Sequence, residues 1–415
     1  MAGNSGPPAQ RLAGRAMSEP WRNWSGSIAF TPARFERPRD AGELARVVAD
    51  AHRRGGHVRV VGAGHSSSEI LIGEDTLVSL EHFRGVVSSD RAACEATVRS
   101  GSTLADLGTA LYLDDLALPN YGDVATQTIG GAIGTGTHGT GHALQNLSQL
   151  MLAATLVTGR GEIRRIGRDE LDVLRAARVS LGTLGVFTDI TLKLVPAFEV
   201  ERREYATTSD QGLAHLDQLI AENRSFDFYW YPRRDDMKLR LVNPGGGGTA
   251  SLPYARELER TSGYGHQVIP THSGIPQHFE ESEFALPAEN GVACFQAVRA
   301  RVKQRWRATV GWRVLYRTIA ADDAYLSPAH GRATVSISLH QNASLPWREF
   351  FADIAPIFLA HDGRPHWAKK HSLRAAEIAP RYPQWHAFHR VRAALDPDGV
   401  FLTPHLRELL GVDPP

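Results

Sequence analysis

One stretch decides the fold of this chain: Val60-Val61-Gly62-Ala63-Gly64-His65-Ser66-Ser67-Ser68. An apolar segment, Val58–Val61, leads directly into a loop of glycines and small residues with a histidine at its centre. Glycine lets the backbone adopt positive φ and approach a ligand closely, and successive N–H groups can form a concave site for phosphate oxygens. The loop therefore has two interpretations: a dinucleotide-binding loop with a reactive histidine, or an ordinary turn after a strand.

A nicotinamide-binding Rossmann domain fits this stretch poorly. Gly62-Ala63-Gly64 resembles its glycine fingerprint, but Ser67 stands where the third glycine belongs. The loop also lies after a predicted helix and strand, and does not open a βαβ unit with a ribose-binding acid about 20 residues later.

The composition is that of a globular protein: 42% of the 415 residues are hydrophobic, 22% are charged, and the net charge is +1. This length predicts two domains. The charge balance gives no reason to expect nucleic acid or an anionic membrane surface as a partner, and the basic stretch 297–307 is interpreted as a solvated helix face. No apolar run is long enough to span a bilayer. Residues 1–20 predict a disordered tail, and two cysteines, Cys94 and Cys294, predict no disulfide framework and a cytoplasmic location.

Local patterns predict the elements that surround the first loop. Asp40 is the expected N-cap of a helix that ends at Gly55-Gly56. Strands and a second capped helix are expected at residues 76–80, 96–99 and 101–107. Beyond Pro196 the pattern changes to a longer alternation of strands and helices.

Two further glycine-rich segments follow. Residues 129–141 contain six glycines in thirteen positions and no carboxylate, lysine or arginine. This composition is poor for a packed helix, and it predicts backbone lying against a flat, bulky ligand. A third glycine loop, residues 181–188, precedes a strand expected at residues 190–194.

In this order, the three glycine segments resemble the flavin-binding domain of the vanillyl-alcohol oxidase superfamily. Within that superfamily, the chain is most similar to aldonolactone oxidases and alditol oxidases. The resemblance extends over about residues 22–408, and further matches lie in residues 279–287, 317–323, 363–369 and 395–402. The most specific of these is the tetrad His366-Trp367-Ala368-Lys369.

The resemblance implies an α+β fold of two domains with FAD between them. The expected parts are an FAD-binding domain at 21–197, a cap domain at 198–384 with a large antiparallel sheet and flanking helices, and a segment at 385–415 that returns to the first domain. His65 matches the histidine that many relatives link covalently to the flavin, and imidazole is nucleophilic near neutral pH. The expected cofactor contacts are Val61, Gly62, Ala63, Gly64, His65, Ser66, Ser67, Gly131, Gly134, Thr135, Gly136, His138, Gly139, Gly141, Gly185, Val186, His366 and Lys369.

Three side chains are expected to carry the chemistry. Lys369 is expected to stabilise the negative charge that develops on the reduced flavin. Arg317 matches an arginine that relatives place near the substrate oxygen, where a cation lowers the pKa of the reacting hydroxyl. A salt bridge from Arg317 to Asp322 or Asp323 is the structural alternative. His340 shares one face of a predicted strand with Ser338, and both are candidate substrate contacts, with His340 also a candidate proton acceptor.

The sequence departs from the family pattern beside Arg317. Lactone and alditol oxidases carry Glu-x-Arg at this place, whereas this chain reads Leu315-Tyr316-Arg317. Leucine cannot anchor a hydroxyl and leaves the charge of the arginine unmatched. We therefore expect a substrate with fewer hydroxyls, or one with its own negative charge, to meet Leu315 and Arg317.

The function predicted from these features is FAD-dependent oxidation of a CH–OH group in a sugar lactone, polyol or related small molecule. Oxygen is the expected electron acceptor. A dehydrogenase that uses a quinone or cytochrome is the alternative within the same fold, and a flavoprotein without catalytic activity is the alternative from another class. The oligomeric state stays open.

Overall fold

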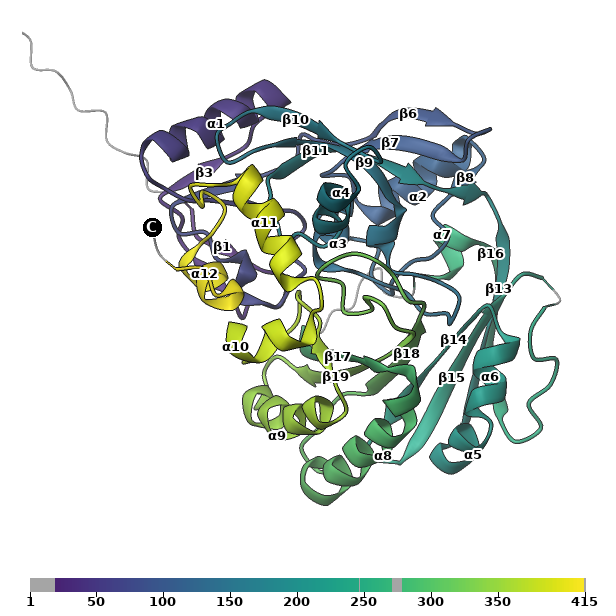
Figure 1. The fold of residues 1–415 in the computed structure, drawn as a ribbon. Coiled ribbons are helices and arrows are strands. Elements are labelled where there is room, and N and C mark those ends of the chain that lie inside the picture. The colour runs from purple at the N-terminus through teal and green to yellow at the C-terminus, as the bar shows by residue number, and fades with distance from the viewer. Residues whose placement is uncertain (1–18, 246, 271–277, 414–415) are drawn as a thin grey trace, which may run out of the picture.

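The computed structural model describes residues 19–245, 247–270 and 278–413, so most of the predicted N-terminal tail lies outside the described residues. In Figure 1 the N-terminal elements occupy the top of the view, and a broad sheet with its helices lies below them. Helices from the end of the chain return beside the first helix.

The first glycine loop leaves a small parallel sheet. Its three strands lie in the order β3-β5-β4, with bounds Arg34–Glu36, Thr76–Ser79 and Val58–Val61. Helix α1 (Ala41–Arg53) covers this sheet through a buried stripe of Leu44, Val48 and Ala51. The Asp40 side chain accepts a hydrogen bond from the Glu43 N–H at 2.8 Å, which confirms the predicted N-cap.

A five-stranded antiparallel sheet forms the rest of the N-terminal half. Its order is β10-β9-β11-β7-β6, with bounds Ile163–Ile166, Met151–Val157, Val186–Lys193, Glu95–Arg99 and Val86–Asp90. Helices α2 (Leu104–Leu113) and α4 (Leu171–Ala177) contribute buried leucines to the core around this sheet. The predicted helix start is confirmed, because Thr103 caps α2.

The second glycine segment corrects one expectation. Residues 129–141 were expected not to form a helix, yet helix α3 spans Ile129–Thr135. The helix is only seven residues long and buries Ile129, Ala132 and Ile133. It ends at Gly136, whose φ of 75° is the left-handed conformation that favours glycine at a helix C-terminus. Tertiary packing of one apolar face has overridden the low helix propensity of glycine.

An eight-stranded antiparallel sheet dominates the second half of the chain. Its order is β16-β13-β15-β14-β18-β19-β17-β20, with bounds Arg256–Tyr264, Glu199–Thr208, Asp236–Asn243, Ser225–Tyr231, Val314–Ile319, Thr334–Asn342, Phe279–Pro287 and Arg364–Pro365. Helices α8 (Gly291–Arg301) and α9 (Trp347–Ala360) lie along one side of it in Figure 1. This agrees with the large antiparallel sheet and flanking helices expected from the family resemblance.

The two faces of this sheet differ in chemistry because side chains alternate along each strand. Phe228, Tyr316, Ile337 and Phe284 are in register across β14, β18, β19 and β17, and all are buried. The Phe228 ring packs edge-on against Phe295 of α8, with ring centroids 5.0 Å apart. The residues next to them in sequence are mostly polar and face the other way, toward the N-terminal half.

The end of the chain closes onto its beginning. Helices α11 (Trp385–Leu395) and α12 (Pro404–Leu410) lie beside the first elements in Figure 1. The Val58 N–H donates to the Val400 carbonyl at 2.8 Å, and His52 lies 3.0 Å from Asp398. The last segment therefore helps to hold the strand that precedes the glycine–histidine loop.

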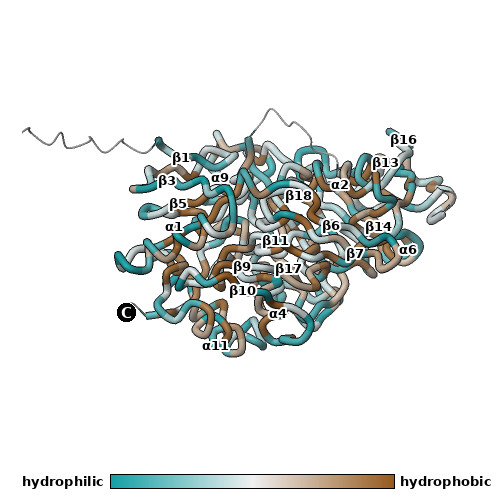
Figure 2. The backbone as a smooth tube through the Cα atoms, turned by 90° about the horizontal axis from the view of Figure 1, so that it is seen from above, coloured by the Kyte–Doolittle hydropathy of each residue, from teal (hydrophilic) through white to brown (hydrophobic). Residues whose placement is uncertain are grey.

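The remaining short elements connect these layers. They are β1 (Trp21–Arg22), β2 (Ala29–Phe30), β8 (Leu116–Ala117), β12 (Val195–Pro196), α5 (Ser209–Ala214), α6 (Leu216–Glu222), α7 (Gly265–Val268), α10 (Ala375–Ile378) and the single turns Glu69–Leu71, Leu147–Leu150, Ala288–Asn290, Val302–Trp306 and Ala379–Arg381. Figure 2 shows hydrophobic residues gathered along central strands such as β9, with hydrophilic residues around the periphery.

The basic stretch forms the end of α8 and the turn that follows it. Arg299 and Lys303 pair with Asp235, and Arg301 and Arg305 pair with Asp353. These four charges are thus paired with acidic side chains, and Arg307 donates to the Arg233 carbonyl. Among the described residues, no helix is both long and apolar enough to cross a bilayer.

Candidate active site

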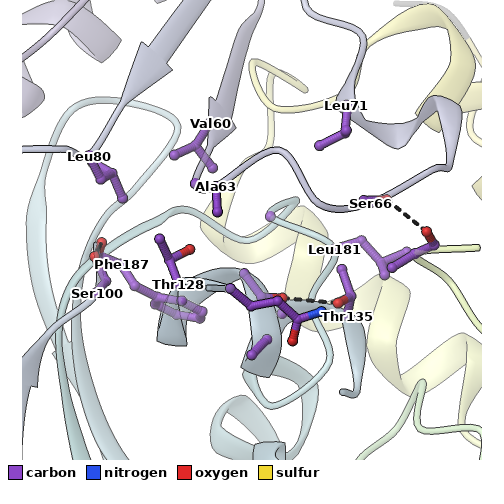
Figure 3. Close-up of a pocket in the computed structure, with 18 of the residues that line it drawn as sticks. Val60, Ala63, Ser66, Leu71, Leu80, Ser100, Thr128, Thr135, Leu181 and Phe187 are labelled. Atoms are coloured by element: carbon purple, nitrogen blue, oxygen red, sulfur yellow. Dashed lines mark hydrogen bonds between the residues drawn. The ribbon is translucent and has the colours of Figure 1, made fainter. Parts of the chain in front are cut away.

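The three glycine segments meet around one cavity. Figure 3 shows its labelled side chains arriving from β4 and its loop, from α3 and from the segment before β11. The predicted cofactor contacts that line it are Gly62, Ala63, Gly64, His65, Ser66, Gly131, Gly134, Thr135, Gly185 and Val186. The structure thus brings together segments that lie far apart in the sequence.

Close packing explains the glycines of the cleft. Gly64 has a φ of 64°, and a Cβ there would lie 3.0 Å from the Trp21 ring. Gly185 has a φ of 150°, and a Cβ there would lie 2.7 Å from the Val157 carbonyl oxygen. The backbone at Gly62 and Ala63 remains exposed to the cleft. The cavity is therefore walled largely by main chain, as a flat ligand with a phosphate tail requires.

Arg59 is a cleft residue that the sequence analysis missed. It lies in β4, is 4% exposed, and donates from Nη1 to the Leu181 carbonyl at 2.7 Å. Burial lowers its pKa to about 10, and no acidic side chain of the described chain pairs with it. A buried cation without an acidic partner suits the diphosphate of a dinucleotide. The feature of the sequence that could have indicated this residue is an arginine inside an otherwise apolar strand.

Some predicted contacts lie outside the cleft lining. Val61 packs in a small core with Ile28 and Leu77. The others are held by the backbone: Ser67 donates its N–H to Ala368, Gly136 ends α3, Gly139 packs on Asn120 and Tyr121, and Gly141 donates its N–H to Thr318.

A second cavity adjoins the first. His65, Ser66 and Ala368 are among the residues that line both. The wall of the second cavity consists of the polar face of the eight-stranded sheet, the segment after β20, the loops on both sides of α3 and part of the first glycine loop. It contains the predicted residues His138, Leu315, Arg317, His340, His366 and Lys369.

Lys369 and His340 meet at one carboxylate. Lys369 Nζ donates to Glu281 Oε2, and His340 Nε2 lies 3.4 Å from Glu281 Oε1. Burial lowers the pKa of His340 to about 4. Burial is the largest single influence and opposes ionisation of Glu281, but the nearby positive groups, Lys369 first, and the Lys369 hydrogen bond together outweigh it and lower the carboxyl pKa. At neutral pH the cluster therefore holds an ammonium, a carboxylate and a neutral imidazole.

His138 and His366 gather around a second carboxylate, Glu283. His138 Nε2 lies 2.6 Å from Glu283 Oε1, and its Nδ1 lies 2.8 Å from the Gly139 carbonyl oxygen. Two ligands held by one Zn²⁺ at about 2.0–2.2 Å each would lie further apart than 2.6 Å in a tetrahedral site. A shared proton therefore joins His138 to Glu283. Burial lowers the pKa of His366 to about 4.

The surroundings of Arg317 correct the expectation that its charge is unmatched. Arg317 Nη2 donates to Asp123 Oδ2 at 2.7 Å, and Arg317 is 8% exposed. The same carboxylate accepts from Arg240 Nη1 at 3.0 Å and from the Tyr229 hydroxyl at 2.7 Å. An acid from the loop before α3 thus balances an arginine on β18, and the argument for a negatively charged substrate loses its basis.

The alternative partners of Arg317 have other contacts. Asp323 pairs with Arg175 and Arg178 at 2.9 and 2.8 Å. Asp322 accepts from Asn146 and Ser327, and burial raises its pKa to about 6. Neither acid contacts Arg317.

The two other predicted substrate contacts differ in position. Leu315 lines the second cavity and is 3% exposed. Ser338 is its neighbour in register on β19, but it is fully buried and does not line the cavity.

Three acids of the pocket were not predicted: Asp123, Glu281 and Glu283. A signal for two of them was present, because Glu281 and Glu283 alternate with Ser282 in residues 279–287 and so share a face of that strand. Asp123 lies in an irregular loop and gave no such signal.

These features fit FAD. A cleft lined by backbone, with a buried uncompensated arginine in its wall, suits the dinucleotide. The adjoining polar pocket can place a small substrate against the ring system at the boundary of the two cavities, where His65 stands. The ring of His65 packs against Trp24, with centroids 4.7 Å apart.

Comparison with known proteins agrees with this geometry. A family model described as an FAD binding domain matches residues 32–167, and a model described as D-arabinono-1,4-lactone oxidase matches residues 249–409. L-gulono-1,4-lactone dehydrogenase of Mycobacterium tuberculosis is 35% identical, covering 95% of this chain and 100% of that protein. Alditol oxidase of a Streptomyces species is 31% identical with the same coverage, and L-gulonolactone oxidase of Mus musculus is 26% identical over 94% of this chain and 98% of that protein.

Among solved structures, cholesterol oxidase from B. sterolicum superposes with a TM-score of 0.82 at 15% identity. The match covers 94% of this chain and 96% of that one, and it supports the fold. Three findings lead to the family assignment: full-length identity above 30%, the two family models and the cleft. The chain belongs to the aldonolactone and alditol oxidase group of FAD-dependent oxidoreductases, within the vanillyl-alcohol oxidase superfamily.

Proposed function

We propose that this enzyme oxidises a CH–OH group of a sugar lactone or polyol, with His340 as the acceptor of the hydroxyl proton. The observation that carries the proposal is that the two cavities adjoin and share lining residues, with His340, Arg317 and Lys369 all in the wall of the second. The full-length relatives, a lactone dehydrogenase and an alditol oxidase, support this substrate class.

Bound FAD supplies a hydride acceptor, and the side chains of the pocket do the remaining work. Arg317 is fixed by Asp123 and directs its positive charge toward the substrate oxygen, where it favours loss of the proton. His340 carries a hydrogen on Nδ1, because that atom lies 3.2 Å from the Arg313 carbonyl, an acceptor only. Its Nε2 is then free to take the proton.

Lys369 has the role of a fixed cation that stabilises negative charge on the reduced cofactor. A charge in this position is worth most where water is excluded, and the Lys369 side chain is 20% exposed. His366, two residues before Ala368, holds the local turn through the Ala368 N–H at 3.2 Å from its Nδ1.

Within this proposal, His65 forms the covalent link to FAD. Its place at the boundary of the two cavities supports the assignment. Denaturing electrophoresis followed by ultraviolet illumination tests it: fluorescence should travel with the polypeptide and be lost in His65→Ala. Fluorescence that survives in His65→Ala would place the link elsewhere.

The test of activity is anaerobic bleaching of the bound FAD. Aldonolactones, polyols and hydroxy acids are mixed with the enzyme under nitrogen, and the absorbance of oxidised flavin is followed. We expect bleaching by a lactone or polyol. If only a hydroxy acid reduces the flavin, the proposed substrate class is wrong.

Oxygen is the proposed electron acceptor, and a quinone or cytochrome is the alternative. The full-length relatives include both a dehydrogenase and oxidases by name, so each is a candidate. Stopped-flow reoxidation in air separates them, because an oxidase reoxidises far faster than free reduced flavin does.

We also propose that residues 21–197, 198–384 and 385–415 act as the FAD domain, the cap and the returning segment, and that the enzyme works in the cytoplasm. The change from the two N-terminal sheets to the eight-stranded sheet supports the first boundary. Free Cys94 and Cys294 fit a reducing compartment.

A further inference from the structure

One carboxylate in the pocket has no task in the mechanism above, although it contacts two groups that do. Glu281 on β17 accepts a hydrogen bond from Lys369 and lies 3.4 Å from His340 Nε2. The side chains of Glu281 and His340 are 10% and 8% exposed. Strand pairing fixes this arrangement, because Glu281 and His340 are register partners of β17 and β19.

The hydrogen bonds of His340 show where a new proton would go. Nδ1 is committed to the Arg313 carbonyl, so an added proton must reside on Nε2. There it would meet Glu281 Oε1. The imidazolium formed by proton transfer would therefore lie beside the Glu281 carboxylate.

The charges that face His340 act in opposite directions. Glu281 from β17 favours its protonation, whereas Arg313 at the start of β18 and Lys369 after β20 oppose it. Glu281 thus offsets part of the cost of placing a proton on His340, which burial and the two cations oppose.

We propose that Glu281 is a positioning residue that couples the proton leaving the substrate to the charge of Lys369. Before reaction, Lys369, Glu281 and neutral His340 carry no net charge. After it, with the proton on Nε2, they carry one positive charge. The inference rests on the proposed function and adds one carboxylate that serves both the base and the lysine.

The step balances in atoms and electrons. The C–H bond of the substrate breaks, and its electron pair leaves with the hydride to FAD. The O–H bond breaks, its proton goes to His340 Nε2, and its electron pair forms the C=O bond. The positive charge gained by the cluster equals the negative charge that the hydride carries to the cofactor, so the site stays neutral while water is excluded.

A purely structural ion pair is the competing explanation, and a matched control separates the two. Glu281→Gln removes the charge with little change of shape. Glu280→Gln makes the same change one residue earlier on the opposite face of β17, where the buried carboxylate lies 3.5 Å from Lys370 Nζ. Glu281→Asp keeps the charge and serves as the conservative variant.

The first readout is sulfite titration of the bound, oxidised FAD, which needs no substrate. Removing the negative charge beside Lys369 should favour an anionic adduct, so we expect Glu281→Gln to bind sulfite roughly three- to tenfold more tightly than wild type. Glu280→Gln and Glu281→Asp should bind it as wild type does. Equal sulfite affinity in Glu281→Gln and wild type overturns the proposal.

The second readout is the pH dependence of kcat/KM. Glu281 raises the pKa of His340, so its removal lowers that pKa, and the loss of activity at acid pH should move about one unit lower. Glu281→Asp should restore the wild-type profile. An unshifted acid limb in Glu281→Gln contradicts the coupling. If no CH–OH donor reduces the wild-type flavin, the proposed function fails, while the sulfite comparison still decides whether Glu281 tunes Lys369.

Discussion

The dinucleotide cleft and the substrate pocket share a boundary but are built in opposite ways. The cleft is made of main chain from glycine loops, and each loop is visible as a local run in the sequence. The pocket is made of long polar side chains whose partners come from distant segments of the chain, as with Arg317 and Asp123. The difference predicts that the cleft is sensitive to added volume, whereas the pocket is sensitive to lost charge.

The largest effect should come from filling the cleft. Gly134 lines the cavity on α3, and a Cβ there meets nothing within 4 Å. Gly134→Leu should therefore abolish FAD binding because the side chain occupies ligand space. The flavin-to-protein absorbance ratio measures this. Gly245→Ala, on a loop with the same open space but outside both cavities, is the control and should retain full flavin content.

Removing a charge from the pocket should give the next largest effect, on catalysis and not on flavin content. Arg317→Met leaves Asp123 buried with one partner fewer and takes away the cation near the substrate oxygen. We expect kcat/KM to fall by about 10² to 10³, as for loss of one preorganised donor. A variant that loses its flavin in parallel would show that the two regions do not behave separately.

A smaller and graded effect, on the free energy of unfolding, is expected when the pH is lowered. Burial lowers the pKa of His340 and of His366 from 6.5 to about 4. The unfolded chain therefore takes up protons first as the pH falls, so stability is complete above about pH 6.5 and is lost progressively down to pH 4. Each histidine contributes up to about 3 kcal/mol to this loss. Calorimetry between pH 7 and 4 measures it. Because burial also lowers the pKa of His371 and His389 to about 4, His366→Asn should flatten the slope by roughly a quarter.

The smallest effect should come from a side chain of the cleft. Thr135 lines the cavity, but its hydroxyl donates to the Gly131 carbonyl within α3 at 2.9 Å (Figure 3). Because the cleft acts through its backbone, Thr135→Ala should weaken FAD binding less than about fivefold. Titration of the apoprotein with FAD measures this. A large loss of FAD affinity would mean that side chains, and not mainly the backbone, bind the ligand in the cleft.

The contrast between the cleft and the pocket also separates the features that could be predicted from the sequence from those that could not. Asp40 as a cap, β4 and the glycine–histidine loop could be predicted because their causes lie within a few residues. Helix α3 could not, because Ile129 and Ile133 are helical only when the core around them is formed. Leu315 was predicted to leave Arg317 unmatched because only local sequence was considered, whereas Asp123 arrives from a loop 194 residues away.

By itself, the sequence determined the positions of the three loops that face the cleft, because glycine acts on its own backbone, and its resemblance to a known family implied the cofactor class. Tertiary structure alone decided which charges meet: Lys369 with Glu281, His138 with Glu283 and Arg317 with Asp123. An ion pair depends on the separation of two side chains in space. In each of these pairs one member stands on the eight-stranded sheet and the other on a loop packed against it, so only the folded chain sets that separation.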